Sequence, residues 1–437
     1  MNVAERVREL HDSSVDRAAA GLGIAGEPAD PRPVAGVVAG ESEPARAGSG
    51  RPVIGVVGGD VPVEIIEACG GRAFRLSAAE REAGVEAVEL LGAAVDSVFH
   101  SILDRILTGE FGFLRALVVS RDCQGSLRLF YVLRMLARQG RTVPEVHLVD
   151  LLHLSRESTR DYNARQIAAL AEVVAGWTGT ALTEATLYKA RESRGQLAGA
   201  LRDLRAQRVA GAVPGATALR LYALAQTEAP ADSIALIDAV LESARPAAPR
   251  EPDLHSATRG TADSAGSAGR RAGAVGPSES PAEGKPRVFL TGSTVDQVAV
   301  YEKLEAAGVL IVGEDHNWGD PVADLWAAPA AATEPAATYT AIAEHRLRLG
   351  PMAQTSGLSD RARFSAACAR RCAAEVVLSI GRHNDPAPGW DRPGLIRELG
   401  SDLRVAALSV AAHTWSADEL GAAVALLIRE DCEATAR

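Results

Sequence analysis

The chain has 437 residues, of which 47% are hydrophobic, so it carries enough apolar surface for more than one core and is not disordered throughout. Its 56 acidic residues outnumber its 46 basic residues, which gives a net charge of −10 without a basic stripe and excludes a general nucleic-acid-binding protein. Five scattered cysteines exclude a disulfide framework, and the lack of a signal peptide or a long apolar run predicts a cytoplasmic protein without a membrane span.

The first part of the chain predicts a parallel sheet covered by helices. Residues 1–50 contain one short amphipathic helix and then a flexible lead rich in glycine, proline and alanine. Residues 51–158 form a first α/β domain, in which short apolar runs alternate with helical patterns. The runs predict strands at 52–59, 116–120 and 145–152, and the patterns predict helices at 62–70, 84–108 and 126–140.

The second part of the chain repeats this alternation after two segments of different character. Residues 159–245 are helical throughout, and residues 246–285 carry too few large apolar side chains to be more than a linker. Residues 286–437 form a second α/β domain, with strands at 287–293, 309–315, 374–381 and 403–410 and a closing helix at 416–430. The sequence therefore predicts an α/β fold with two parallel-sheet domains, flavodoxin-like or Rossmann-like, joined by a helical segment.

Chemistry is expected just beyond the strands, because open parallel sheets bind ligands outside the carboxyl ends of their strands. Five predicted strands are followed by polar or glycine-rich residues, at 58–60, 120–123, 291–293, 314–317 and 381–385. Cys123 stands out because a sulfur at a helix start is favoured as a thiolate, which suits a nucleophile or a metal ligand. The alternative is a small hydrophobic side chain in a strand–helix turn.

Two histidines and a short glycine turn are weaker candidates. His316 and His383 each follow a strand and are candidate catalytic residues, although a hydrogen-bonded loop histidine is the alternative for both. Thr291, Gly292 and Ser293 could hold a phosphate through backbone N–H groups, or could simply begin a helix. No P-loop, nucleophile elbow or HExxH helix occurs, so the chain is not predicted to be a P-loop ATPase, an α/β-hydrolase or a zincin.

The order of the motifs resembles one known family. The segment PVIGVVGGDVPVEIIEACGGRAFRL and the strand–Cys–helix segment ALVVSRDCQGSLRLFYVLRML are similar to segments of the 2-hydroxyacyl-CoA dehydratase and benzoyl-CoA reductase family. The resemblance extends over about 50–245 and 286–415 and matches a D-component type of subunit. It implies two α/β domains, an acyl-CoA ligand, a heterodimer, and an iron–sulfur cluster held by three cysteines. It also implies an ATP-dependent activator protein that supplies a low-potential electron.

The resemblance fails at the cluster ligands. The family's three cysteines correspond here to Asp96, Cys123 and Asn384, so one thiolate of three remains. Clusters are held mainly by thiolates, although histidine can substitute and aspartate occasionally does. Asp96, His316 or His383 could therefore complete a site with Cys123. A [4Fe–4S] cluster or another iron site at the three family positions is one expectation. The absence of any cofactor from this chain is the favoured one.

These observations identify the chain as a divergent dehydratase-like or benzoyl-CoA reductase-like subunit that acts on an acyl-CoA thioester. The resemblance places substrate near the VPVEII helix start, with Pro62 and Glu64, and near the 291–293 turn, while Arg121 is one arginine that could bind CoA phosphates. Whether the chain is a lyase-like or an oxidoreductase-like enzyme stays open. The alternative is a non-catalytic subunit that pairs with a cysteine-complete homologue. A homodimer is a further arrangement, and neither nucleic acid nor a membrane is an expected partner.

Overall fold

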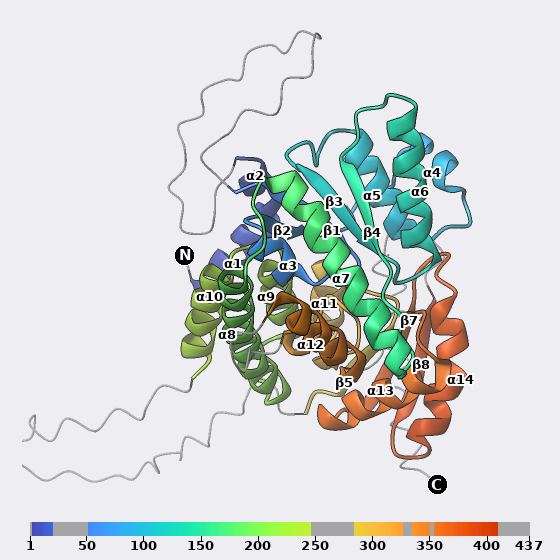
Figure 1. Cartoon of the computed structure of the whole chain (residues 1–437). Coiled ribbons are helices and arrows are strands. Elements are labelled where there is room, and N and C mark those ends of the chain that lie inside the picture. The colour runs from blue at the N-terminus through green and yellow to red at the C-terminus, as the bar shows by residue number, and fades with distance from the viewer. Residues whose placement is uncertain (1, 21–50, 246–283, 327–333, 350–353, 410–437) are drawn as a thin grey trace, which may run out of the picture.

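The computed structural model describes residues 2–20, 51–245, 284–326, 334–349 and 354–409. Within them, two four-stranded sheets are parallel throughout, which confirms the predicted fold class. The first sheet has the order β2-β1-β3-β4 (Figure 1). The second sheet has the same pattern, β6-β5-β7-β8. The strands are β1 (Val53–Val57), β2 (Arg72–Arg75), β3 (Ala116–Ser120), β4 (Glu145–Val149), β5 (Arg287–Gly292), β6 (Leu310–Glu314), β7 (Val376–Gly381) and β8 (Arg404–Ser409).

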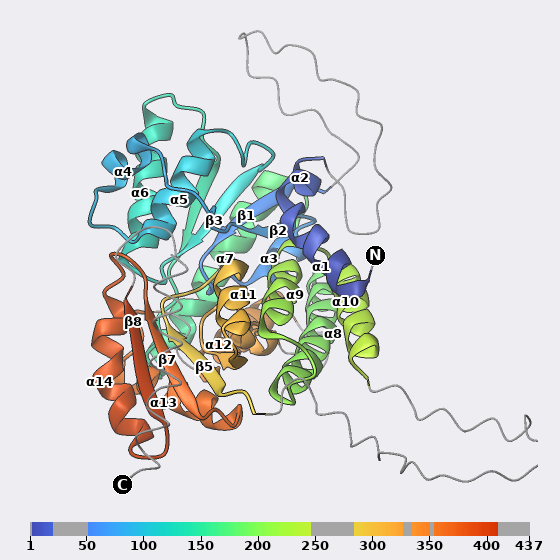
Figure 2. The ribbon, with the colours of Figure 1, turned by 180° about the vertical axis from the view of Figure 1, so that it is seen from behind.

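Helices cover both sheets and fill the space between them (Figures 1 and 2). We call the first sheet with its covering helices the first unit, and the second sheet with its helices the second unit. The helices before β5 are α1 (Val3–Asp12), α2 (Ser14–Ala19), α3 (Val63–Ala68), α4 (Val85–Leu91), α5 (Ser97–Leu107), α6 (Gln124–Arg138), α7 (Glu157–Thr178), α8 (Glu184–Val209), α9 (Gly215–Thr227) and α10 (Pro230–Ala244). Those after β5 are α11 (Val298–Ala306), the 3-10 helix η1 (Asp320–Asp324), α12 (Pro335–Arg348), α13 (Leu358–Arg371) and α14 (Ala387–Leu399).

The central strands form because their apolar runs can be buried on both faces. All five residues of β1 and all five of β3 are buried, as the sequence VIGVV and ALVVS require. Their side chains alternate between two cores, one under α5 and α6 and the other under α3 and α7. The N-terminal amphipathic helix is confirmed as α1, which buries Val7 and Leu10 against the helical segment.

The helix predicted at 84–108 is wrong as a single element. The structure has two helices there, because α4 ends at Gly92, whose φ of +87° lies in a region that favours glycine. The chain then turns through residues 93–96, and α5 begins after Asp96, whose side chain caps the amide of Val98. Apolar periodicity continues across this break, which is why the pattern did not reveal it. The break brings residues 93–96 to the edge of the first sheet.

The helical segment joins the two units rather than standing apart from them. Helix α9 is buried almost along its whole length, contacting β2 of the first sheet and both α11 and β6 of the second unit. Helix α12 follows β6 in sequence but packs along α7, so that Ile342 and Ala343 lie in a core of the first sheet. The expected linker and closing helix lie outside the described residues, apart from the last two residues of the former. No helix among the described residues combines the length and apolar character needed to cross a membrane.

Candidate functional site

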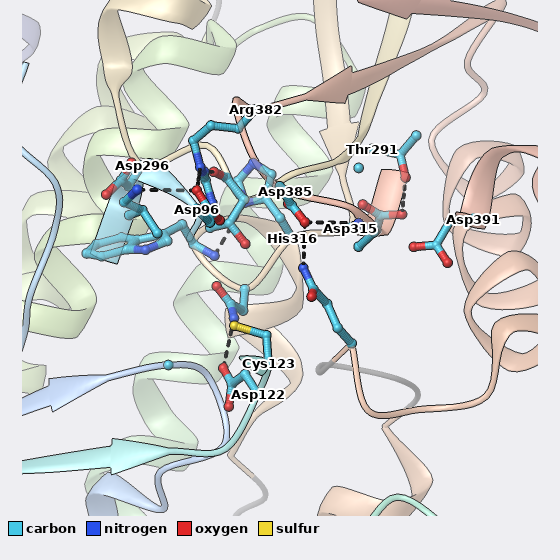
Figure 3. Close-up of a pocket in the computed structure, with 18 of the residues that line it drawn as sticks. Asp96, Asp122, Cys123, Thr291, Asp296, Asp315, His316, Arg382, Asp385 and Asp391 are labelled. Carbon is cyan, nitrogen blue, oxygen red and sulfur yellow. Dashed lines mark hydrogen bonds and ion pairs between the residues drawn. The ribbon is translucent and has the colours of Figure 1, made fainter. Parts of the chain in front are cut away.

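A cavity lies where the carboxyl ends of the two sheets meet. In each sheet the connections run in opposite directions from the first strand, between β1 and β3 and between β5 and β7, and such a switch point is where open α/β sheets bind ligands. Both switch points contribute to the cavity wall, the first through Gly58 and Cys123 and the second through Gly292 and Arg382. Cys123 and Arg382 are labelled in Figure 3. The sequence predicted polar strand ends, and the structure brings those of both sheets to one place.

The cavity wall is rich in charge. Six aspartates and four arginines line it together with Thr291, His316, Trp318 and several apolar side chains. The charged residues are Asp96, Asp122, Asp296, Asp315, Asp385, Asp391, Arg75, Arg361, Arg382 and Arg392. Most of the arginines hold a carboxylate or a carbonyl, as Arg361 does with Asp391 at 2.6 Å. These partners hold the charged side chains in fixed positions within a wall that also contains many apolar side chains.

Two buried aspartates on the cavity wall have strongly raised pKa values. Burial raises the pKa of Asp315 to about 6, although hydroxyl donors, including Thr291 at 2.6 Å, oppose the shift. Burial and the nearby charge of Asp60 likewise raise the pKa of Asp122 to about 6. Asp122 accepts the amide N–H of Gly59 at 2.5 Å and the Ser120 hydroxyl. Carboxyls that titrate close to neutral pH in a cavity are suited to accepting and donating protons.

A buried histidine–aspartate pair supports the Asp122 side of the cavity. His153 Nε2 lies 2.6 Å from Asp60 Oδ2, and both side chains are almost fully buried. Burial lowers the pKa of His153, but the charge and hydrogen bond of Asp60 outweigh it, and the pKa is raised overall. Asn317 of the second unit joins this network, since its amide lies 3.4 Å from Asp122 and its oxygen accepts from Arg75 at 2.7 Å. The network therefore links the two units at the floor of the cavity.

Cys123 lies at the cavity wall and at the start of α6, as the sequence predicted. Its surroundings favour the thiol rather than the thiolate expected at a helix start. Burial and the charges of Asp122 and Asp96 raise the pKa of Cys123 to about 11, and the hydrogen bonds of Ser126 only partly oppose this. The effect of a single helix end is smaller than the cost of burying a charge beside two carboxylates. The catalytic role of Cys123 stays a prediction.

His316 lines the cavity, but its ring nitrogens are already occupied. Nδ1 faces the amide N–H of Trp318 at 3.4 Å, and Nε2 lies 2.9 Å from the Tyr301 hydroxyl, which donates to Glu314. Burial and the charge of Arg208 lower the pKa of His316 to about 3, so the ring is neutral. This arrangement holds the cavity wall in place and leaves His316 little capacity for proton transfer. His383 lies in the turn after β7 and does not line the cavity.

The predicted phosphate turn is only partly available. Thr291 and Gly292 line the cavity, and Gly292 has a φ of +102°. Thr291 donates its hydroxyl to Asp315, however, and the amide of Ser293 donates to the carbonyl of Ile380 at 2.8 Å. The Ser293 hydroxyl donates to Asp385 at 2.7 Å. These groups stabilise the cavity wall before any ligand arrives, so they do not form an open cradle of N–H donors.

Three other predicted substrate residues lie outside the cavity wall. Pro62 caps α3, and Glu64 is buried on that helix with a carboxylate oxygen 4.0 Å from Arg346. Arg121 follows β3 but forms an ion pair with Asp150 at 2.9 Å and does not line the cavity. A substrate-binding role for these residues stays a prediction. Asp122 and Asp315 lie within the strand-end segments 120–123 and 314–317 that the sequence predicted, although neither was singled out there, and Arg75 of β2 was missed.

An outer cleft adjoins the cavity and contains all three positions of the expected cluster ligands. Asp96, Cys123 and Asn384 line this cleft, which shares Cys123 with the cavity. No three side chains of the histidine, cysteine, aspartate and glutamate types converge on a point for a metal within the described ranges. Both oxygens of Asp96 accept from Arg382, at 2.6 and 2.7 Å, and the Asn384 amide nitrogen donates to the carbonyl of Ala93 at 2.7 Å. An engaged carboxylate, an amide and one neutral thiol do not fit an iron–sulfur cluster.

Comparison with known proteins identifies the family of the chain. A sequence search of curated proteins finds no match for the chain. A family model described as 2-hydroxyglutaryl-CoA dehydratase, D-component, matches residues 59–411, which is more than three quarters of the chain. The matched range contains every described strand except β1. It also contains every residue of the cavity wall except Val57 and Gly58. The chain belongs to the family of 2-hydroxyglutaryl-CoA dehydratase D-components.

Proposed function

We propose that the chain is a subunit of a dehydratase-like complex, or of a related benzoyl-CoA reductase-like complex, and that it binds an acyl-CoA thioester in the cavity and the outer cleft. The observation that supports this most is the meeting of two switch points at one cavity within a chain of this family. A homologous subunit, or a second copy of the chain, and an ATP-dependent activator complete the proposed complex.

The two adjoining spaces match the two parts of such a ligand. The cavity offers about 150 Å³, which is room for a small acyl group, and the outer cleft offers about 640 Å³, within the usual range of ligand pockets. The cleft is lined by the exposed side chains of Arg128 and Tyr131 on α6. A guanidinium can pair with a phosphate and an aromatic ring can stack on adenine, so these two residues suit the nucleotide end of CoA.

The residues of the cavity would orient the acyl group and exclude water from it. Thr291 and Asp315 would contact polar groups of the acyl chain on the second unit, and Asp122 would face it from the first unit. With pKa values of about 6, these carboxyls can hold or release a proton near neutral pH. Because the cluster ligands do not fit, any electron transfer in the complex would take place in a partner subunit.

Isothermal titration calorimetry with butyryl-CoA and with free butyrate tests this proposal. We expect butyryl-CoA to bind, butyrate to bind far more weakly, and Arg128→Ala to weaken binding of the thioester about tenfold, as the loss of one phosphate contact predicts. Arg138→Ala is the matched control, because Arg138 is exposed on the same helix and does not line the cleft. Failure of every acyl-CoA to bind, or equal effects of the two arginine substitutions, would refute the proposal.

A non-catalytic role within the same complex is the second candidate. It is favoured by the occupied ring of His316 and by the neutral thiol of Cys123, which leave few free groups for chemistry. In this case the chain would supply one side of the binding site and an interface for a cysteine-complete homologue. Anoxic affinity purification of the tagged chain is expected to recover such a homologue. Dehydration of an acyl-CoA by the purified chain without any partner would contradict this candidate.

A further inference from the structure

Three residues far apart in the sequence line the outer cleft, and we call the region of the cleft around them the corner. Asp96 precedes α5, Cys123 precedes α6, and Asn384 follows β7, yet all three line the same space. Their position in one cleft agrees with the correspondence to the three cysteines of the family, because cluster ligands lie near one another.

The carboxylate at this corner holds a charge from the other unit. Arg382 of the second unit donates its Nε to Asp96 Oδ1 at 2.6 Å and its Nη2 to Oδ2 at 2.7 Å (Figure 3). Each side chain is only 11% exposed. A two-point ion pair of this kind fixes both the distance and the orientation of its partners, and it is stronger than a single hydrogen bond. For Asp96 to bind iron, it would have to leave a nearly buried guanidinium without its counter-ion.

The amide at this corner crosses between the units in the same place. Asn384 has a φ of +62°, a conformation that asparagine adopts more readily than most residues, and this turns its side chain toward the first unit. Its amide nitrogen donates to the carbonyls of Ala93 at 2.7 Å and Val95 at 3.4 Å. The segment 93–96 therefore receives both contacts, one on its carbonyls and one on the carboxylate at its end.

We propose that this corner is an interdomain clamp that takes the place of an iron–sulfur cluster. We define the clamp as the Arg382–Asp96 ion pair together with the hydrogen bonds of Asn384 to the 93–96 segment. The clamp holds the carboxyl edges of the two sheets together, which keeps the cavity formed without a metal, and the chain takes up no cluster at this position. The inference depends on the family and the contacts at the corner, and it does not require the chain to bind acyl-CoA.

Anaerobic reconstitution with ferrous iron and sulfide tests the first half of the proposal. We expect the wild-type chain to stay colourless and free of bound iron, and the Asp96→Cys/Asn384→Cys variant, which restores three thiolates, to turn brown with about four irons per chain. About four irons in the wild-type chain would overturn the proposal. Absence of a cluster from both proteins would overturn the assignment of these three positions as the converted ligand corner. Circular dichroism confirms that the variant is folded.

A double-mutant cycle on the ion pair tests the second half. Asp96→Asn and Arg382→Gln should each lower the melting temperature by several degrees, because each leaves its former partner unpaired. The double variant should lose clearly less than the sum of the two. Glu86→Gln is the matched control, since Glu86 pairs with Arg141 at 2.8 Å but both side chains are about half exposed. Additive effects of the Asp96 and Arg382 substitutions, or losses no larger than that of the control, would overturn the clamp.

Discussion

Replacement of Arg208 is expected to destabilise the protein more than any surface substitution. Arg208 projects from α8 and is completely buried, with its guanidinium 2.8 Å from Glu314 of β6 and 2.6 Å from Asp320 of η1. Tyr222 and Tyr301 donate their hydroxyls to the same two carboxylates. The substitution Arg208→Leu removes the only cation that contacts the carboxylates of Glu314 and Asp320 within the described part of the chain. It leaves these two carboxylates buried beside each other.

The magnitude follows from the burial of all three side chains, none of which exceeds 2% exposure. Removing one partner of a buried ion pair costs about 3–5 kcal/mol of unfolding free energy, and two stranded carboxylates place this variant toward the upper end of that range. The loss should be smaller at pH 5 than at pH 7. Without Arg208, the pKa of each stranded carboxyl rises in the folded protein, so the folded state gains stability from protonation as the pH falls.

Urea unfolding followed by circular dichroism measures the loss directly. Arg141→Gln is the control, because its exposed pair with Glu86 should contribute no more than about 1 kcal/mol. The double variant Arg208→Leu/Glu314→Gln should recover part of the stability, since it removes one of the two stranded charges. A loss below about 1 kcal/mol for Arg208→Leu, or a loss that does not change between pH 5 and pH 7, would refute this reasoning.

Three further predictions concern the cavity wall. Gly292→Ala should lower the melting temperature far more than Gly140→Ala, although both glycines have positive φ angles. A Cβ at Gly292 would lie 2.3 Å from the carbonyl oxygen of Ile380, whereas a Cβ at Gly140 would have no atom within 4 Å. Equal shifts in melting temperature would contradict this close approach. The unfolding free energy of the wild-type protein should fall relative to that of Asp315→Asn as the pH rises from about 4 to about 6. The reason is that the pKa of Asp315 is raised to about 6 in the folded state, so the folded protein loses this proton at a higher pH than the unfolded chain. Parallel pH profiles of unfolding free energy for the two proteins would count against this. Cys123 should react slowly with iodoacetamide at pH 8, where a pKa of about 11 leaves about one thousandth of it as thiolate, and rapid alkylation seen by peptide mass spectrometry would show that the thiol is more acidic.

Much of the fold could be predicted from local pattern. Every strand except β2 lies within one of the predicted apolar runs. Short continuous apolar segments between glycine or polar residues are typical of strands that are buried on both faces. The break between α4 and α5 could not be predicted in the same way. A single Gly92 within an apolar helical pattern is compatible with a continuous helix. Its positive φ and the contacts of Asp96 with Val98 and Arg382, which accompany the turn, depend on the folded chain.

The candidate site was predicted in its parts but not in its assembly. The strand ends at Cys123, Thr291 and Gly292 do line the cavity, whereas Arg121 lies beside the same sheet edge and points to Asp150 instead. The sequence predicts that a residue lies at the carboxyl end of a strand. Whether its side chain faces the cavity depends on the rotamer and on the partner that the side chain finds. His316 illustrates the same limit, because its occupied nitrogens come from Tyr301 and Trp318.

The local apolar pattern of the sequence predicts an α/β protein with two parallel-sheet units, which the structure confirms. Residue identity shows that Asp96 and Asn384 carry no thiol, whereas their correspondence with cluster cysteines of the family stays a prediction. The net charge of −10 excluded a general nucleic-acid-binding protein, and the five scattered cysteines excluded a disulfide framework. Neither observation pointed to a functional site. The contacts of Asp96 and Asn384 with the other unit, and the burial that raises the pKa of the Cys123 thiol, arise only in the folded chain. The physical reason is that ion pairing and desolvation depend on which residues are brought together in space, and residues 96 and 382 are neighbours only in the folded chain.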